Sequence, residues 1–377
     1  ASGYFSAELE DGVYDITYTK DDFFPESLPD IAIYSNTTLS NLTLLERTTL
    51  IHVPSLFSTI EEAAERAFEG DTILIAEGQY NLNAKISITK NYVTIASNYI
   101  FSNDYDDVKN TIIYGNNDRG ISIDGPDNIH ISGLTIKNCH DGAIFFRFSN
   151  YNTISHCILT ENTGGRAAGV YVYDWSNVDI KNTIISNNTA DYSGAITVWS
   201  GSTALTNCII DENQGKYGAI YGFSAQSLTI VNSIISNNID NDSNTNYSIQ
   251  NITNTISYSN FFNNEFPNNN DLYGNNVTTN LNNDPSDAYY NIQINPQFVD
   301  ADNGDYNIQE NSPCIDAGDP NLPYDPDGSI SDMGALPSDF GTRIPILHNV
   351  PENYFTIQSA LNAAESGDTI LVQPGPY

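Results

Sequence analysis

Short apolar runs, separated by Gly, Asn and Ser, recur along the middle of the chain. The heptapeptide NTIISNN at residues 182–188 returns as NCIIDEN at 207–213 and as NSIISNN at 232–238. A related form, HCILTEN, stands at 156–162, so successive copies start 26, 25 and 25 residues apart. The runs are too short for helices and rich in β-branched residues, which predicts strands. A second phrase, built on Gly-Ala-Ile, keeps the same period, so the chain repeats a structural unit.

A repeat of this length has room for three short strands and three turns. Stacking the units about 4.8 Å apart pairs each strand with its neighbours above and below. The pattern therefore predicts an all-β fold, a right-handed parallel β-helix, over residues 50–337. Ile184, Ile209 and Ile234 are expected to form an aliphatic ladder. An asparagine ladder is expected at a turn, made by Asn188, Asn213 and Asn238.

The four cysteines show no metal-binding or redox spacing. Cys157 and Cys208 occupy a repeat position that also holds Thr183 and Ser233. We therefore expect small, buried core residues there.

The end of a solenoid must be covered, and the sequence contains a suitable segment. Residues 58–61 form a capping-box pattern that opens an amphipathic helix, and Gly70 ends it. The same opening motif, from Val53 to Tyr80, returns 297 residues later and runs to the end of the sequence. We therefore expect a β-helix at 50–337, a linker at 338–349 and the start of a second β-helix at 350–377.

The first 46 residues follow a different pattern. Alternating polar and apolar positions at 3–9, 14–18 and 39–45 predict strands. Three such strands are marginally stable alone, so residues 1–46 are expected to be a partial β-sandwich within a longer tandem protein.

The charge of the chain limits its partners. Asp and Glu number 47 against 13 Lys and Arg, a formal net charge of −34. A field of this sign repels nucleic acid and anionic lipid headgroups. No apolar stretch is long enough for a membrane span. The polar, Asn- and Tyr-rich composition favours an extracellular location.

The opening motif and the exit sequence resemble the pectin-lyase-like superfamily. The exit comprises SPCIDAG at 312–318, DPDGS at 325–329 and DMGA at 332–335. The likeness is to the branch of right-handed β-helix repeat proteins on bacterial surfaces, and it implies a β-helix with a carbohydrate-facing history. Residues 1–46 resemble the end of a carboxypeptidase-regulatory-like β-sandwich.

The strands after the Gly-Ala-Ile phrase offer a candidate binding surface. If Ile144, Val170 and Ile196 point inward, alternate residues point outward and place aromatic rings over successive repeats. Such rings suit the C–H faces of sugars. The candidate carbohydrate-binding residues are Phe145, Arg147, Tyr171, Tyr173, Trp199, Tyr221 and Phe223. The alternative is a second small core, with the rings covered by a long turn or by residues 265–300.

Catalysis has weaker support in the sequence. The resemblance implies that an enzyme of this superfamily would combine acidic groups on one sheet with an Arg, Lys or His. The candidates here are Arg147, Arg166, Asp174 and Asp191, but no two of these acids share an outward column of adjacent repeats. We therefore lean against an enzyme.

Residues 325–332 resemble an acidic calcium loop, with Gly328 for the sharp turn. The candidate metal ligands are Asp325, Asp327, Ser329 and Asp332, which would hold a structural Ca²⁺. The alternative is a C-terminal cap rich in Asx turns.

Two classes of function remain open. The favoured one is a structural or adhesive segment of a large secreted bacterial surface protein, which spaces other domains and binds polysaccharide along its side. The alternative is a polysaccharide lyase or glycoside hydrolase acting on acidic polysaccharide. End-to-end assembly of tandem copies into a filament is a third expectation to test.

Overall fold

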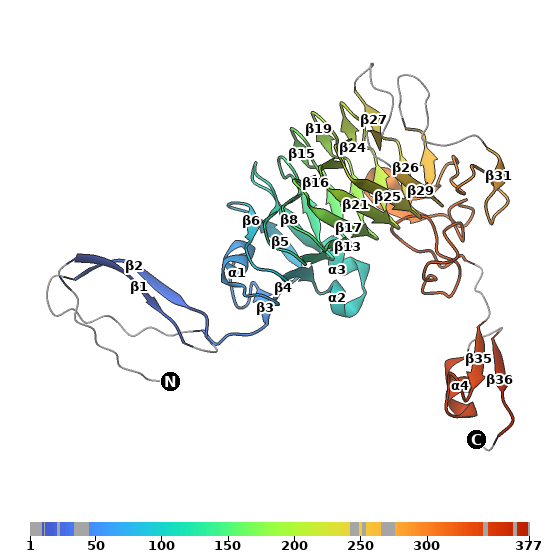
Figure 1. The fold of residues 1–377 in the computed structure, drawn as a ribbon, viewed down its shortest axis with the longest axis horizontal. Coiled ribbons are helices and arrows are strands. Elements are labelled where there is room, and N and C mark those ends of the chain that lie inside the picture. The colour runs from blue at the N-terminus through green and yellow to red at the C-terminus, as the bar shows by residue number, and fades with distance from the viewer. Residues whose placement is uncertain are drawn as a thin grey trace.

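The strands between residues 50 and 262 stack in parallel as the rungs of a solenoid (Figure 1). The computed structural model describes residues 10, 12–20, 23–33, 45–241, 249–250, 254–264, 276–341, 346–364 and 368–375. Within them, three long parallel sheets form the walls of the solenoid. The predicted fold class, an all-β parallel β-helix, is confirmed.

The chain passes through the three walls in a fixed order in each rung. The nine-stranded sheet contains β3 (Leu50–Val53), β4 (Thr72–Ile75), β7 (Thr94–Ser97), β10 (His130–Ser132), β13 (Asn152–Ser155), β17 (Asn177–Lys181), β21 (Ser202–Thr206), β25 (Ser227–Val231) and β29 (Asn254–Ser257). The eight-stranded sheet contains β5 (Gly78–Asn81), β8 (Thr111–Tyr114), β11 (Thr135–Lys137), β14 (Ile158–Thr160), β18 (Ile184–Ser186), β22 (Ile209–Asp211), β26 (Ile234–Ser236) and β30 (Asn260–Phe262). The seven-stranded sheet contains β6 (Ile86–Ile88), β9 (Ile121–Asp124), β12 (Ile144–Arg147), β16 (Val170–Tyr173), β20 (Ile196–Trp199), β24 (Ile220–Phe223) and β28 (Ile249–Gln250). A short four-stranded sheet lies between the last two walls and contains β15 (Thr163–Gly164), β19 (Thr189–Ala190), β23 (Gln214–Gly215) and β27 (Ile239–Asp240).

Apolar side chains from the three walls fill the inside of the solenoid. In the seven-stranded sheet, Ile144 pairs with Val170, and Val170 pairs with Ile196, and all three are buried. The inward positions predicted for this wall are therefore confirmed. Cys157 and Cys208 are buried as well, and their backbone N–H groups donate to Thr183 and Ser233 of the next rung.

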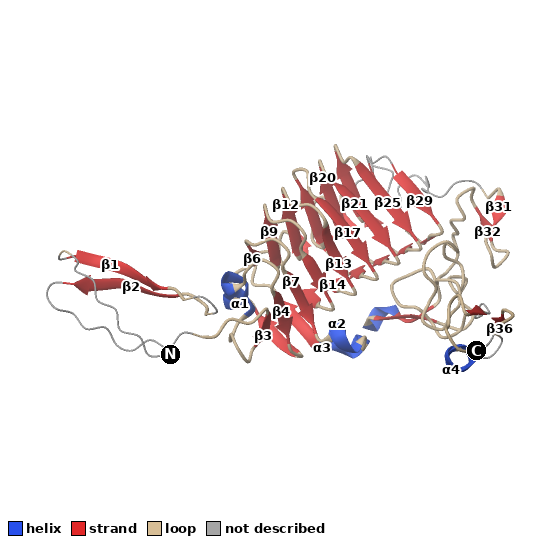
Figure 2. Cartoon of the chain, turned by 60° about the horizontal axis from the view of Figure 1, so that its bottom comes forward, coloured by secondary structure: helices blue, strands red, loops and turns tan. Residues whose placement is uncertain are grey.

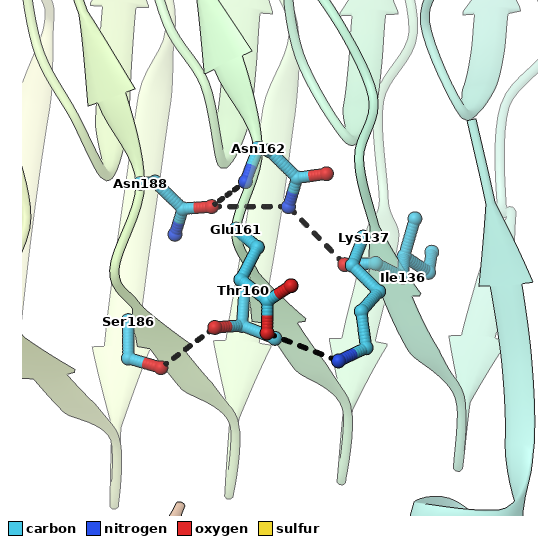
Figure 3. Close-up of polar contacts among 7 residues, drawn as sticks. All are labelled: Ile136, Lys137, Thr160, Glu161, Asn162, Ser186 and Asn188. Atoms are coloured by element: carbon cyan, nitrogen blue, oxygen red, sulfur yellow. Dashed lines mark hydrogen bonds and ion pairs between the residues drawn. The ribbon is translucent and has the colours of Figure 1, made fainter. Parts of the chain in front are cut away.

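The predicted asparagine ladder is confirmed and extends further than the sequence indicated. The Asn188 side-chain oxygen accepts from the backbone N of Asn162 at 2.9 Å and from its Nδ2 at 3.0 Å (Figure 3). Asn162 Nδ2 also donates to the Ile136 carbonyl at 3.1 Å. The same pattern continues through Asn213 and Asn238. The ladder satisfies buried backbone groups at each turn, and so fixes the register of neighbouring rungs.

The described helices are short. α1 (Ile60–Arg66) covers the end of the stack near β3 and β4 (Figure 2), and its N-cap is Thr59, one residue later than the predicted box. α2 (Tyr99–Ser102) and α3 (Tyr105–Asn110) interrupt the second rung, which the sequence did not predict. None of the described helices is long and apolar enough to cross a bilayer.

The C-terminal segment covers the outside of the eight-stranded sheet. β33 (Phe298–Asp300), η1 (Ala301–Asn303) and β34 (Asp305–Ile308) belong to it, as does the short hairpin of β31 (Thr278–Thr279) and β32 (Pro285–Ser286). Ile184, Ile209 and Ile234 stack as predicted, but they pack against Tyr306 and Met333 of this segment. Their neighbours one position later fill the interior instead.

The repeated opening motif adopts the same local structure twice. β35 (Leu347–Val350), α4 (Ile357–Ala363) and β36 (Thr369–Val372) each lie 297 residues after β3, α1 and β4. β35 and β36 pair in parallel, as β3 and β4 do. A second β-helix domain stays a prediction.

The N-terminal residues form an antiparallel pair, β1 (Gly12–Tyr18) with β2 (Glu26–Ile33). The strand predicted at 14–18 lies within β1, and β2 was not predicted. The strands predicted at 3–9 and 39–45 fall almost wholly outside the described residues, so the β-sandwich stays a prediction.

Candidate functional site

The outer face of the seven-stranded sheet carries two parallel columns of side chains. Successive residues of a strand point to opposite faces, so every second residue of each rung faces outward. The first column runs from Ser87 through Ser122, Phe145, Tyr171 and Thr197 to Tyr221. The second column consists of Asp124, Arg147, Tyr173, Trp199 and Phe223. All seven predicted carbohydrate-binding residues lie in these two columns.

The aromatic rings of the first column are covered. Phe145, Tyr171 and Tyr221 are only 4%, 2% and 7% exposed. The Arg119 guanidinium lies 3.7 Å from the centre of the Phe145 ring, and Arg166 Nη1 donates to the Tyr171 hydroxyl at 3.0 Å. Phe145 and Tyr171 form a second small core with Ala167, against which Tyr173 and Trp199 pack, and Tyr221 lies against Tyr192 and Tyr217.

The rings of the second column are accessible and follow one another over three rungs. We call Tyr173, Trp199 and Phe223 the aromatic shelf. The ring centres of Tyr173 and Trp199 are 6.2 Å apart, and those of Trp199 and Phe223 are 4.2 Å apart. Tyr173 and Trp199 are half-buried, and Phe223 is 42% exposed. The shelf is a continuous aromatic surface one ring wide.

Arg166 borders the aromatic shelf. Its guanidinium lies 4.9 Å from the Trp199 ring centre, a cation–π distance. The Thr197 hydroxyl donates to the Arg166 carbonyl at 2.6 Å and so fixes the loop that carries it. Hydrogen bonding to the Tyr171 hydroxyl raises the pKa of Arg166. A permanent positive charge with several N–H donors therefore stands beside the rings.

A cleft of about 350 Å³ opens at the other end of the second column. Its polar lining consists of Lys85, Ser87, Thr89, Arg119, Ser122, Asp124 and Arg147. Arg147 forms a bidentate ion pair with Asp124. Its Nε lies 2.8 Å from Oδ1, and its Nη2 pairs with Oδ2. Arg119 is paired with Asp141 at 3.1 Å. The lining thus gathers three of the thirteen Lys and Arg residues of an otherwise acidic chain.

Three charged residues of this cleft were missed from the sequence: Lys85, Arg119 and Asp124. The signal for Asp124 is the strand ISID at 121–124, which aligns with IFFR 23 residues later. The heptapeptide of the later rungs is absent from this part of the chain. In addition, α2 and α3 lengthen the rung that contains β9. The period was therefore not traced back this far.

Of the candidate catalytic residues, Asp174 lies close enough to Arg147 for its charge to act on the guanidinium, but Asp191 lies elsewhere. Asp191 lines a separate hollow of about 520 Å³ with His140 and Lys216, on the side of the four-stranded sheet. Arg147 is a poor general base, because hydrogen bonding to Asp124 raises its pKa. His156 stacks on Tyr99 at 4.7 Å, and its burial lowers its pKa.

The acidic loop of the C-terminal segment uses its carboxylates internally. Asp327 Oδ1 accepts from the backbone N and hydroxyl of Ser329, at 2.9 and 2.6 Å. Asp325 Oδ2 accepts from the backbone N of Asp332, and Asp332 accepts from Asp316 and Ser338. No three His, Cys, Asp or Glu residues in the described part of the chain form a group that could hold a metal ion. Ca²⁺ binding by the four candidate ligands stays a prediction.

The fold and the family comparison both indicate a right-handed parallel β-helix. Residues 71–233 match the family model described as a right handed beta helix region. That segment contains the cleft and the aromatic shelf. No curated protein is a significant sequence match.

Solved structures similar to the chain are carbohydrate-active enzymes. Pectate lyase Pel9A is 13% identical with a TM-score of 0.42, over 73% of this chain and 90% of that chain. A mannuronic acid specific polysaccharide family 6 lyase from human gut microbiota is 12% identical with a TM-score of 0.40, over 57% of this chain and 54% of the lyase. An alginate lyase from Paenibacillus sp. is 16% identical with a TM-score of 0.39, over 59% of this chain and 77% of the lyase. At these values no residue role or activity transfers to this chain.

Proposed function

We propose that the β-helix is a structural, adhesive segment of a secreted bacterial surface protein that binds polysaccharide along the aromatic shelf. The observation that supports binding is the run of Tyr173, Trp199 and Phe223, one ring on each of three successive rungs. Rungs are about 4.8 Å apart, a spacing similar to the length of one pyranose unit in an extended glycan. A chain lying along the solenoid axis would therefore meet one ring per sugar.

The structural part of the proposal rests on the rungs and their caps. Every strand of the three walls is paired on both sides except at the ends, where α1 covers one end. Such a solenoid is a rigid spacer that can separate other domains of the same chain. The second opening motif supports a tandem arrangement, because its Ile357 and Val372 are exposed where Ile60 and Ile75 are buried. We propose that further rungs cover those side chains in a second β-helix.

Substitution of Trp199 tests the binding proposal. Trp199→Ala and Phe223→Ala are expected to weaken retention on a glycan array by about tenfold, the loss typical of a central aromatic contact. Phe101→Ala is the matched control, since Phe101 is an exposed ring on α2 and lies outside both columns. Melting temperatures of all variants show that the fold is kept. Unchanged binding in both shelf variants contradicts the proposal.

The cleft beside Arg147 favours a second candidate function, a lyase or hydrolase acting on acidic polysaccharide. Lys85, with the ion-paired Arg119 and Arg147, gives this cleft N–H donors for uronate carboxylates. Incubation with polygalacturonate or alginate, with and without Ca²⁺, separates the two functions. A rise in absorbance from unsaturated sugar ends supports a lyase, new reducing ends without that rise support a hydrolase, and either activity should be lost in Arg147→Ala. Electron microscopy of the full-length protein tests end-to-end assembly.

A further inference from the structure

Four exposed aromatic rings lie at one corner of the solenoid, where the seven-stranded sheet turns into the nine-stranded sheet. We call Tyr92, Phe148, Tyr151 and Trp175 the corner rings. Tyr92 lies between β6 and β7, Phe148 and Tyr151 lie between β12 and β13, and Trp175 lies between β16 and β17. They are 53%, 52%, 74% and 62% exposed. Figure 2 shows the strands of these two sheets, β9 and β12 beside β13 and β17, as adjoining stacks.

All four corner rings have a left-handed backbone. Their φ angles are 58°, 51°, 60° and 62°. This region is unfavourable for bulky L residues, and Asn or Gly adopts it more easily. At the turn between the nine- and eight-stranded sheets, three successive rungs place Asn182, Asn207 and Asn232 at the left-handed position, and other rungs place Gly133, His156 and Tyr258 there.

The solenoid geometry therefore does not explain the corner rings. The turn needs a left-handed residue, but Asn would serve, as it does at the other turn. Large exposed rings in unfavourable conformations point instead to a function that uses the rings. The corner adjoins the second column, because Phe148 directly follows Arg147 along the chain, with its ring centre 5.8 Å from the Arg147 guanidinium, and Trp175 lies two residues after Tyr173.

We infer that the corner rings are a second row of sugar contacts, and that the ligand is a neutral polysaccharide. This inference rests on the proposed function, because it widens the same binding surface from the shelf to the corner. Polar side chains lie among the rings along the chain, since Asn150 precedes Tyr151 and Asn177 follows Trp175 by two residues, and Asn177 Nδ2 donates to Asn150 Oδ1 at 2.9 Å. Rigid rings among hydrogen-bonding side chains suit the mixed polar and apolar faces of a glycan.

The charges at the corner exclude a polyanion. The Arg147 charge is neutralised by Asp124, and Asp174 also acts on this guanidinium. Asp127 adds a further carboxylate one rung earlier and accepts from the backbone of Asn150. With a net charge of −34 on the whole chain, a polyuronate would be repelled along most of its length. A neutral glycan meets no such barrier.

Native affinity gels test the inference with the full chain. Xyloglucan, galactomannan and mixed-linkage β-glucan serve as neutral probes, and polygalacturonate and alginate serve as acidic probes. We expect retardation by at least one neutral probe and none by the acidic probes. Trp175→Asn and Tyr151→Asn should each weaken that retardation by about fivefold or more, the loss of a well-placed aromatic contact. Because Asn accepts the left-handed backbone, their melting temperatures should not fall.

The outcomes separate the inference from the proposed function. Phe101→Asn is the control, and it should bind as the unsubstituted protein does. If Trp199→Ala loses binding and Trp175→Asn keeps it, the corner rings are not contacts, and the shelf stands. Retardation by acidic probes alone, sensitive to Trp199→Ala, overturns the neutral ligand but not the shelf. No retardation by any probe overturns both.

Discussion

The hydroxyl of Tyr306 donates a hydrogen bond to Asp211 Oδ2 at 3.2 Å, across 95 residues of sequence. Asp211 occupies a position that Ser186 and Ser236 hold in the neighbouring rungs. It also accepts from the Ser236 hydroxyl at 2.6 Å. A buried carboxylate on the eight-stranded sheet thus anchors the C-terminal segment that covers this wall.

Removing the Tyr306 hydroxyl should loosen that segment. Tyr306→Phe is expected to lower the free energy of unfolding by about 1–3 kcal/mol, because a buried carboxylate loses one of its donors. Urea denaturation followed by fluorescence measures the change. Tyr324→Phe, at an exposed tyrosine of the same segment, is the control and should have little effect. Equal effects of the two substitutions would mean that the bond does not hold the segment.

The acidic loop should make stability depend on pH. Burial, with the charges of Asp332 and Asp327, raises the pKa of Asp325 to about 7 from 3.8. The folded state then binds more protons than the unfolded state between about pH 4 and pH 7, so the contribution of Asp325 to stability falls as pH rises through that window. We expect a higher melting temperature at pH 5 than at pH 8 from this group, and a smaller difference in Asp325→Asn. An unchanged difference would contradict this assignment.

The same assay tests the prediction of Ca²⁺ binding. A bound cation would offset the repulsion between Asp325 and Asp332 when both are charged. Added Ca²⁺ at pH 8 is then expected to raise the melting temperature, and a chelator to reverse the rise. Asp327→Asn should lose the response. No shift with Ca²⁺ counts against the ion and leaves the Asx-turn cap as the interpretation.

The asparagine ladder should contribute strongly to stability. Asn213 Nδ2 donates to the Ile185 carbonyl at 2.8 Å, and its Oδ1 accepts from the backbone of Asn188 at 3.2 Å. Asn213→Ala leaves these buried groups without partners, so a loss of about 2–4 kcal/mol is expected. Thermal unfolding measures it against Asn116→Ala, at an exposed loop position. A loss no larger than in the control would mean that water replaces the amide.

The four cysteines should be unreactive in the folded protein. Cys139, Cys157, Cys208 and Cys314 are buried, and burial raises the pKa of each thiol to about 12. Very little thiolate is therefore present at pH 8. A thiol reagent should modify none of them until denaturant is added, and then all four. Fast modification of Cys157 in native conditions would contradict a closed interior.

The periodic part of the fold could be predicted because each period has the same requirements. A repeat of about 25 residues fixed the stacking of Ile184 on Ile209 and of Asn188 on Asn213, as the register shows. Periodicity gives the face of a sheet on which a side chain lies, but not what lies above that face. Arg119 covers Phe145, and the C-terminal segment covers Ile184. Neither cover belongs to the repeating pattern.

The candidate site was predicted in part for the same reason. The second column was placed on the correct face, where Tyr173 and Trp199 are half-buried and Phe223 is exposed. The cleft was missed because its residues belong to earlier rungs, where inserted helices hide the period. The corner rings were missed because their turn positions follow no alternation, so only the backbone angles distinguish them.

Because the shelf has one ring per rung, its length is set by the number of rungs that carry a ring. Inserting or deleting one whole rung, about 25 residues, would lengthen or shorten the aromatic surface by one ring. The packing of the other rungs would stay the same. The reach of this surface can therefore change in discrete units without redesign of the interior. If the shelf binds a glycan as proposed, the number of rungs sets the number of sugar units in contact.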